Sequence, residues 1–161
     1  MSDLRSAVTP TVFYRDPMAA LRWLEAAFGF ETTLLLTDAD GKVGHAEMTF
    51  RNCGIGVAGE WAGDVLGGAR MVSPASLEGA ATQFIRIALE DGLDAHCETA
   101  RAAGATITQE PEDQFYGART YRARDPEGHV WNFSQEIEVV SFEEMTAATC
   151  LKVQTALPKE A

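Results

Sequence analysis

Charged and titratable side chains fall on two predicted strands, and they are the first candidates for chemistry. His45 and Glu47 lie two residues apart in the alternating run 42–51, so their side chains share one strand face. A histidine beside a carboxylate can work as an acid/base pair or supply two ligands of a metal ion; the alternative is a solvated sheet face. Arg86 lies in the strand-like run 82–89. A charge on a half-buried strand needs a partner, either Glu47 or an anionic or carbonyl group of a ligand.

Aromatic residues near the predicted loops could stack on a planar or apolar ligand. The residues concerned are Trp61, Phe115, Tyr116 and Tyr121, joined by Arg119. Core or dimer packing is the alternative for each of them. Trp23, Trp131 and Phe133 are assigned to the core beneath the helices, whereas His96 and His129 are expected to be exposed.

The bulk composition excludes several classes of protein. A chain of 161 residues suits one domain, and its net charge of -11 disfavours nucleic acid and anionic membranes while favouring a cationic or neutral ligand. No apolar run approaches the roughly 18 residues of a spanning helix, and the N-terminus leads into no signal-peptide run, so a cytoplasmic protein is expected. Three cysteines without CxxC spacing predict free thiols. Nucleophilic triads, P-loops and dinucleotide fingerprints are absent from the sequence, which leaves hydrolysis, ATP use and hydride transfer without support.

The first half of the chain predicts a strand, a helix and three strands over residues 8–59. Asp16 and Pro17 are typical of a helix start, and Gly29 is typical of a helix end. Apolar residues recur between them at helical spacing, namely Met18, Leu21, Leu24 and Phe28. The run after Gly29 predicts a hairpin followed by a short third strand.

The second half repeats this order over residues 82–135. Asp91 is expected to cap its helix and Gly104 to end it, and the spacing of 104 − 91 = 13 equals the 29 − 16 = 13 of the first half. An offset of 75 residues therefore superposes the two helices. A tight turn, Asp125-Pro126-Glu127-Gly128, precedes the last strand. The expected fold is α+β, with two βαβββ modules forming a curved mixed sheet around one pocket.

Domain boundaries follow from this repeat. Residues 1–138 are predicted to form a single domain, in which module one (8–59) and module two (82–135) are joined by a loop, 60–81. The length and apolar residues of that loop favour a segment that covers a site. Residues 139–161 are predicted to hold a short helix and a tail, because Ser141-Phe142-Glu143-Glu144 has the pattern of a capping box.

Five short motifs occur in one order along the chain. They are Tyr14-Arg15-Asp16-Pro17, Ala27-Phe28-Gly29-Phe30, Arg101-Ala102-Ala103-Gly104-Ala105, Tyr116-Gly117 and Asp125-Pro126-Glu127-Gly128-His129-Val130-Trp131. In this order they resemble the vicinal oxygen chelate superfamily, which includes glyoxalase I, bleomycin-resistance proteins, fosfomycin-resistance enzymes and extradiol dioxygenases. The resemblance implies the two-module fold and a pocket for a small molecule.

The resemblance also implies four positions for the ligands of a divalent metal, which would polarise vicinal oxygens of a substrate. Carried across by the 75-residue offset, they fall at Thr9, Val57, Phe84 and Asn132. None is a usual metal ligand, and a shift of one residue brings in only Gln83 as a possible ligand. This departure puts glyoxalase-type isomerisation in doubt.

The sequence therefore predicts a small-molecule-binding protein without a metal cofactor, similar to the bleomycin-resistance branch. That branch implies a homodimer that sequesters a planar or cationic compound. The alternatives are a metal-dependent isomerase, lyase or transferase that uses His45, Glu47 and Gln83, and a pure interaction module. The predicted ligand-binding residues are Thr11, Phe13, His45, Glu47, Trp61, Phe84, Arg86, Tyr116, Arg119 and Asn132.

Overall fold

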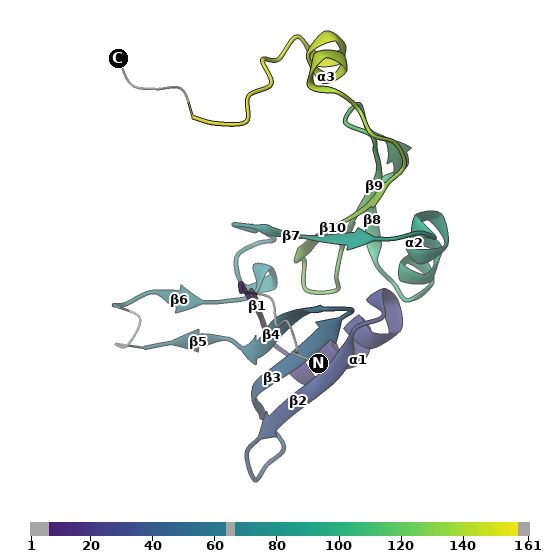
Figure 1. Ribbon diagram of the computed structural model, residues 1–161. Helices are drawn as coiled ribbons and strands as arrows, with labels where there is room; N and C mark the ends of the chain where they lie inside the picture. The colour runs from purple at the N-terminus through teal and green to yellow at the C-terminus, as the bar shows by residue number, and fades with distance from the viewer. Residues whose placement is uncertain (1–6, 64–66, 158–161) are drawn as a thin grey trace.

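Two four-stranded sheets with the same strand arrangement form the frame of the protein (Figure 1). The structure is a computed structural model that describes residues 7–63 and 67–157. Module one consists of β1 (Thr11–Tyr14), α1 (Pro17–Phe28), β2 (Glu31–Thr37), β3 (Val43–Phe50) and β4 (Cys53–Gly59). Its sheet order is β1-β4-β3-β2, in which β1 runs parallel to β4.

Module two has the same plan. It consists of β7 (Phe84–Leu89), α2 (Leu93–Ala102), β8 (Thr106–Asp113), β9 (Ala118–Arg124) and β10 (Val130–Glu136). Its sheet order is β7-β10-β9-β8, and β7 runs parallel to β10. The predicted α+β fold with two βαβββ modules is confirmed.

The predicted ends of α1 are confirmed, whereas the predicted start of α2 is not. The side chain of Asp16 accepts a hydrogen bond from the backbone N–H of Ala19 at 3.0 Å, and Gly29 closes α1 with a φ of 74°. The expected cap at Asp91 is wrong, because Gly92 takes the N-cap position of α2 with a φ of 70°, and the first N–H of the helix, that of Leu93, is instead accepted by Oε1 of Gln135 on β10 at 3.1 Å. Glycine adopts this left-handed conformation easily, so the chain turns there and the helix begins at Leu93.

The segment between the modules contains a small hairpin. Strands β5 (Trp61–Ala62) and β6 (Arg70–Met71) pair antiparallel, and a 3-10 turn, η2 (Pro74–Ser76), follows them. In Figure 1 this hairpin extends away from the two main sheets. At the other end of the chain, α3 (Phe142–Thr149) starts with the predicted capping box, in which Ser141 and Glu144 bond each other's backbone.

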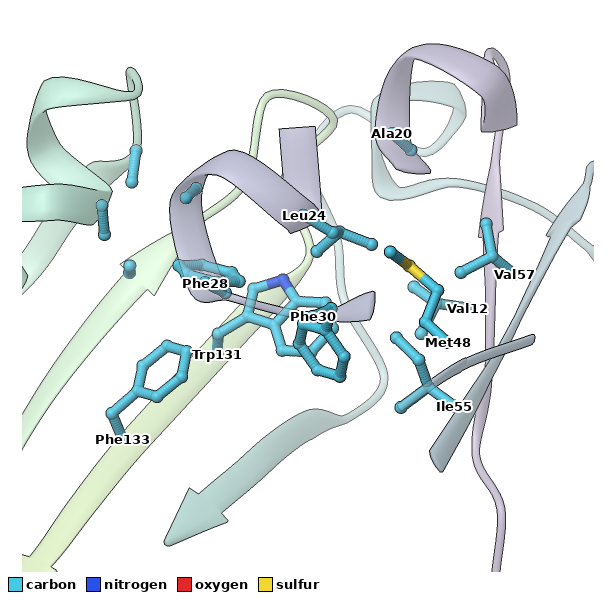
Figure 2. Packing of buried hydrophobic residues seen from close by; sticks show 14 of the residues in the cluster. Val12, Ala20, Leu24, Phe28, Phe30, Met48, Ile55, Val57, Trp131 and Phe133 are labelled. Carbon is cyan, nitrogen blue, oxygen red and sulfur yellow. The ribbon is translucent and has the colours of Figure 1, made fainter. Parts of the chain in front are cut away.

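One hydrophobic core is shared by both modules on the helix-facing sides of their sheets (Figure 2). The centre of the Phe28 ring in α1 lies 5.3 Å from the ring centre of Trp131 and 4.8 Å from that of Phe133, both on β10. Trp23 packs against the same core and donates a hydrogen bond of 2.7 Å to the carbonyl oxygen of Ala103. The assignment of Trp23, Trp131 and Phe133 to the core is confirmed. The opposite faces of the two sheets are called the helix-free faces below.

The turn that precedes β10 ties the modules together. Asp125, which is 4% exposed, accepts hydrogen bonds from the Tyr14 hydroxyl at 2.7 Å and from Nε1 of Trp131 at 3.1 Å. Glu127 accepts from the backbone N–H groups of Arg15 and Asp16. Burial, together with the Asp125 carboxylate, raises the pKa of Tyr14 well above its usual value, so its hydroxyl remains a donor.

Candidate functional site

The helix-free face of module two carries a row of three polar side chains across adjacent strands. Asn132 on β10 is paired in register with Arg86 on β7 and with Arg122 on β9. Their neighbours Trp131, Phe133 and the other core residues point to the helices, so strand alternation puts these three on the opposite face. Arg86 donates a hydrogen bond of 3.1 Å from Nη2 to Oγ of Ser134 in the next row. We call Arg86, Asn132 and Arg122 the arginine row.

A cavity of about 510 Å³ lies on this face, beside the segment that follows β10. It is lined by Arg86, Ala88, Leu89, Glu90, Tyr116, Gly117, Ala118, Ser134, Glu136, Glu138, Val139 and Val140. Backbone N–H groups of Ile137 and Glu138 donate to the carbonyl oxygen of Gly117, which holds the start of this segment beside Gly117. A Cβ at Gly117 would lie 2.3 Å from the carbonyl oxygen of Glu138, so only glycine permits this close approach.

A second cavity, of about 290 Å³, lies between the turn that joins β3 to β4 and strand β7. Its walls are mostly apolar and include Phe30, Phe50, Ile55 and Ile87. Arg86 lines both cavities. It is therefore the predicted site residue that the structure places most centrally.

Two further predicted residues lie close to Arg86. Tyr116 lines the larger cavity, and its ring makes an edge contact with Phe115 at 5.2 Å. Asn132 is the neighbour of Arg86 in the arginine row and is 7% exposed. Phe84 lies two residues before Arg86 on the same strand face and is 56% exposed. The structure thus brings four of the predicted residues together on module two.

Another set of predicted residues lies on the helix-free face of module one. Thr11, Gly56 and Glu47 are paired across β1, β4 and β3, and Phe13 and His45 follow on the same face. Nε2 of His45 lies 3.7 Å from Oε1 of Glu47, and both side chains are about two-fifths exposed. Neither cavity is lined by these residues. The Arg86–Glu47 pair is not found, since the ion pairs among the described residues do not include Arg86.

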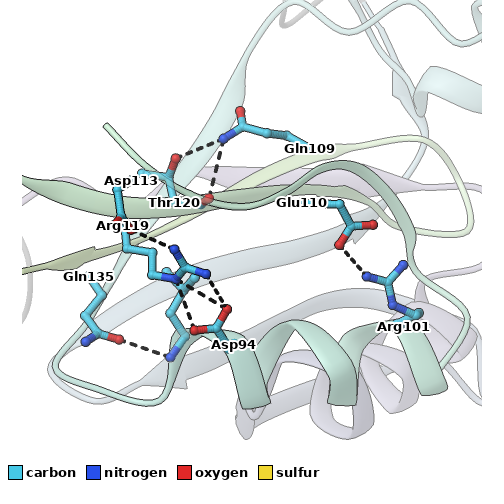
Figure 3. Close-up of polar contacts among 9 residues, drawn as sticks. Asp94, Arg101, Gln109, Glu110, Asp113, Arg119, Thr120 and Gln135 are labelled. Atoms are coloured by element: carbon cyan, nitrogen blue, oxygen red, sulfur yellow. Dashed lines mark hydrogen bonds and ion pairs between the residues drawn. The ribbon is translucent and has the colours of Figure 1, made fainter. Parts of the chain in front are cut away.

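Arg119 points away from the helix-free face (Figure 3). Its guanidinium donates to both carboxylate oxygens of Asp94 on α2 and to Oδ1 of Asp113 on β8, at 2.7 to 3.3 Å. The hydrogen bond with Arg119 lowers the pKa of Asp94. Arg119 is thus held on the helix side of β9 by acidic residues and lines neither of the two cavities. Tyr121, on the same side, is fully buried in the core.

Trp61, also expected at the pocket, lies on the β5–β6 hairpin and is 49% exposed. Neither cavity is lined by any of the described residues of the segment, 60–63 and 67–81. The two histidines expected to be exposed are partly buried and bonded. His96 accepts from the Tyr121 hydroxyl and donates to the carbonyl oxygen of Phe28, and Nε2 of His129 lies 2.8 Å from the carbonyl oxygen of Phe13.

The four carried-over metal positions do not form a ligand set. Val57 is fully buried on the helix side beside Met48 (Figure 2), and the residue paired with Thr11 is Gly56. The pair Thr11–Gly56 in module one occupies the same place in its sheet as the pair Arg86–Asn132 in module two. The first strands are therefore offset by 86 − 11 = 75 residues, but the last strands by 132 − 56 = 76. The residue that corresponds to Asn132 is thus Gly56 and not Val57. Gly56, like Val57, offers no side-chain ligand.

The other carried-over metal positions also fail to supply a ligand set. Thr9 and Phe84 are exposed, and among the four only Thr9 and Asn132 have side chains that could coordinate, both poorly compared with a carboxylate or an imidazole. Across residues 7–63 and 67–157, no three His, Cys, Asp or Glu side chains lie close enough together to hold a metal ion. The residues present therefore do not fit the metal that the resemblance implies.

Some residues of the site were not predicted. Arg122 could have been found by counting back from the Asp125-Pro126-Glu127-Gly128 turn, which fixes its pairing with Asn132. Glu136 and Glu138 belong to a segment without periodicity, so no sequence pattern placed them at the cavity. None of the helices in the described ranges combines the length and apolar character needed to cross a membrane.

Comparison with known proteins agrees with this architecture. The model of the Glyoxalase/Bleomycin resistance protein/Dioxygenase superfamily matches residues 7–133. Uncharacterised proteins of Mycobacterium bovis and Mycobacterium tuberculosis are each 29% identical to the chain over 146 residues, which is 91% of this chain and 93% and 84% of theirs. The chain belongs to the glyoxalase/bleomycin resistance/dioxygenase superfamily.

Solved structures show the same fold. TioX from Micromonospora sp. ML1 is 30% identical and superposes with a TM-score of 0.60 over 82% of this chain and 99% of its own. The fosfomycin resistance protein FosX from Listeria monocytogenes, a structure that contains Mn(II), gives a TM-score of 0.58 at 13% identity over 89% of this chain and 96% of its own. The second comparison concerns the fold alone.

Proposed function

We propose that this protein binds a planar small molecule with a cationic group in the cavity of about 510 Å³ and sequesters it without a metal ion and without breaking a bond. The proposal follows the bleomycin-resistance branch of the superfamily. The observation that carries it is the lining of the cavity, which includes the aromatic residue Tyr116 and the acidic residues Glu136 and Glu138. An aromatic face and nearby carboxylates suit a flat cation.

The charges around the cavity support this choice. Among the described residues, Glu136 and Glu138 have no ion-pair partner, whereas Glu90 is paired with Arg51 at 2.7 Å. Two unpaired carboxylates at one cavity attract a cation more than the same charges spread over the surface. The cavity is also large enough for a compound of drug-like size.

A titration with a fluorescent planar cation such as proflavine tests the proposal, using full-length protein stripped of metal. We expect saturable binding that weakens about threefold to tenfold in Tyr116→Ser and in the double variant Glu136→Gln/Glu138→Gln, since stacking and exposed charge pairs each contribute about 1 kcal/mol. Glu31→Gln, an exposed carboxylate on β2, controls for the loss of charge. Equal binding by all variants, or no binding across a panel of planar cations, would refute the proposal.

We further propose that the protein is a homodimer, as in the bleomycin-resistance branch. Large apolar side chains are exposed at Leu34, Leu36, Trp61 and Phe84, and a second copy would shield such surface. Sedimentation velocity measures the assembly directly. A single species with the 17.4 kDa mass of one chain at all concentrations would contradict the dimer.

A further inference from the structure

Arginines without acidic partners gather on the helix-free face of module two. Arg86, Arg122 and Arg124 are exposed there, and no carboxylate of the described residues lies within 4.0 Å of them. Four other arginines do have such a partner, namely Arg15, Arg51, Arg101 and Arg119. In a chain with 24 acidic and 13 basic residues, acidic partners are plentiful, so a group of unpaired arginines calls for an explanation.

The residue between two of these arginines has an unsatisfied hydrogen-bonding atom. Asn132 is 7% exposed, and its Oδ1 is buried without a partner among the described residues. Neighbouring strands lie about 4.8 Å apart, so Arg86 and Arg122 flank Asn132 at roughly 10 Å from each other. Neither guanidinium reaches Oδ1, although each carries several N–H donors.

The next row of the same face shows that polar side chains can be satisfied internally here. Thr120 accepts a hydrogen bond of 3.0 Å from Nε2 of Gln109 (Figure 3), and Ser134 accepts one from Arg86. Buried acceptors in native proteins nearly always have a partner, and an unpaired one costs about 1 to 3 kcal/mol. The unpaired oxygen of Asn132 is therefore explained most simply by a partner that arrives with a ligand.

We infer that the arginine row is a subsite for an oxyanion that carries a hydroxyl or N–H group beside it, with a planar carboxylate as the expected form. Guanidinium groups recognise carboxylates through paired N–H donors, and the adjacent hydroxyl or N–H of the ligand would donate to Oδ1 of Asn132. The same two cations would repel a metal ion from Asn132. This inference rests on the proposed function, and it makes the expected guest zwitterionic: its cation faces Glu136 and Glu138, and its oxyanion faces the arginine row.

NMR titration of metal-depleted, ¹⁵N-labelled protein tests the inference by observing arginine Nε–H and asparagine NH₂ signals. The probes are 2-hydroxybenzoate, which has an anion and a neighbouring donor, and 2-methoxybenzoate, which lacks the donor. We expect 2-hydroxybenzoate to shift the signals of Arg86, Arg122 and Asn132 saturably and to bind at least about fivefold more tightly than the methoxy compound.

Variants test whether 2-hydroxybenzoate binds at the arginine row. Arg86→Gln and Arg122→Gln should each weaken the binding of 2-hydroxybenzoate about tenfold. The control Arg22→Gln should leave it unchanged, because Arg22 lies exposed on α1 and has no ion-pair partner among the described residues. Both site arginines are exposed, so their variants are expected to fold, and the backbone spectrum checks this. Asn132→Leu should abolish the preference for the hydroxy compound.

The outcomes separate the two proposals. If planar cations bind but 2-hydroxybenzoate shifts none of the three signals, or binds Arg86→Gln and Arg22→Gln alike, the anion subsite is refuted and the proposed function stands. If neither cations nor carboxylates bind, both are refuted. Carboxylate binding at the arginine row without cation binding at Glu136 and Glu138 would support the subsite and overturn the cationic guest.

Discussion

Replacement of Asp125 by alanine tests how strongly the turn before β10 holds the two modules together. The change removes the acceptor for two buried donors, the Tyr14 hydroxyl and Nε1 of Trp131. It also removes the acceptor for the backbone N–H groups of Glu127 and His129, which are partly exposed and can form hydrogen bonds with water instead. A hydrogen bond to a charged group contributes about 1.5 to 3 kcal/mol, so the two buried bonds predict a loss of about 3 to 6 kcal/mol in the free energy of unfolding.

Urea denaturation followed by tryptophan fluorescence and by circular dichroism measures this loss. Asp91→Ala is the matched control, because Asp91 is exposed and neither caps α2 nor makes a hydrogen bond within the described residues; its effect should stay within about 0.5 kcal/mol. Tyr14→Phe removes one of the two buried bonds and should cost about 1.5 to 3 kcal/mol. A loss below about 1 kcal/mol in Asp125→Ala would refute the reasoning that the buried carboxylate holds the modules together.

Three further predictions concern titration, thiols and metal. Burial lowers the pKa of His96, so below the unfolded-state value near 6.5 the unfolded chain takes up a proton that the folded protein does not. Stability should therefore be full above pH 7 and fall towards pH 5, by at most about 1.4 kcal/mol per pH unit from this group, and His96→Gln should flatten that slope in urea titrations; an unchanged slope would contradict it. A thiol reagent such as DTNB should label Cys53 and Cys150 quickly and Cys97 only on unfolding, because Cys97 is buried and burial raises the pKa of its thiol. Re-equilibration of metal-depleted protein with Zn, Ni, Mn or Fe should leave no stoichiometric metal on elemental analysis; retention that is lost in His45→Ala would favour the metal-dependent alternative.

Local rules predicted most of the fold. Asp16, Pro17 and Gly29 sit where capping chemistry expects them, and the alternation of His45 with Ala46 gave the correct faces of β3. The start of α2 was missed because Asp91 and Gly92 offer competing signals. The left-handed Gly92 turns the chain into the helix, and the first N–H is accepted by Gln135 of β10, a contact between distant residues that no local pattern shows.

The site was less accessible to sequence reasoning. Arg86 was found because a charge in an alternating strand stands out. Arg119 and Arg122 lie three residues apart on β9, so strand alternation puts them on opposite faces, but the pairing of Arg119 with Asp94 on α2 depends on how the helix lies over the sheet. The part of the cavity wall that Glu136 and Glu138 supply depends on the contact of residues 137 and 138 with Gly117, which no local pattern encodes.

The position of Phe28 has an evolutionary consequence. The two modules repeat one plan, yet this ring from the first module packs among Trp131, Phe133 and His96 of the second. An ancestral half-length chain could have buried such a ring only against another copy of itself. In the present chain the halves have become dependent on each other, so a gene fragment that encodes either module alone should give a product that aggregates or is degraded, and substitutions at Phe28 should be selected together with those at its partners on β10.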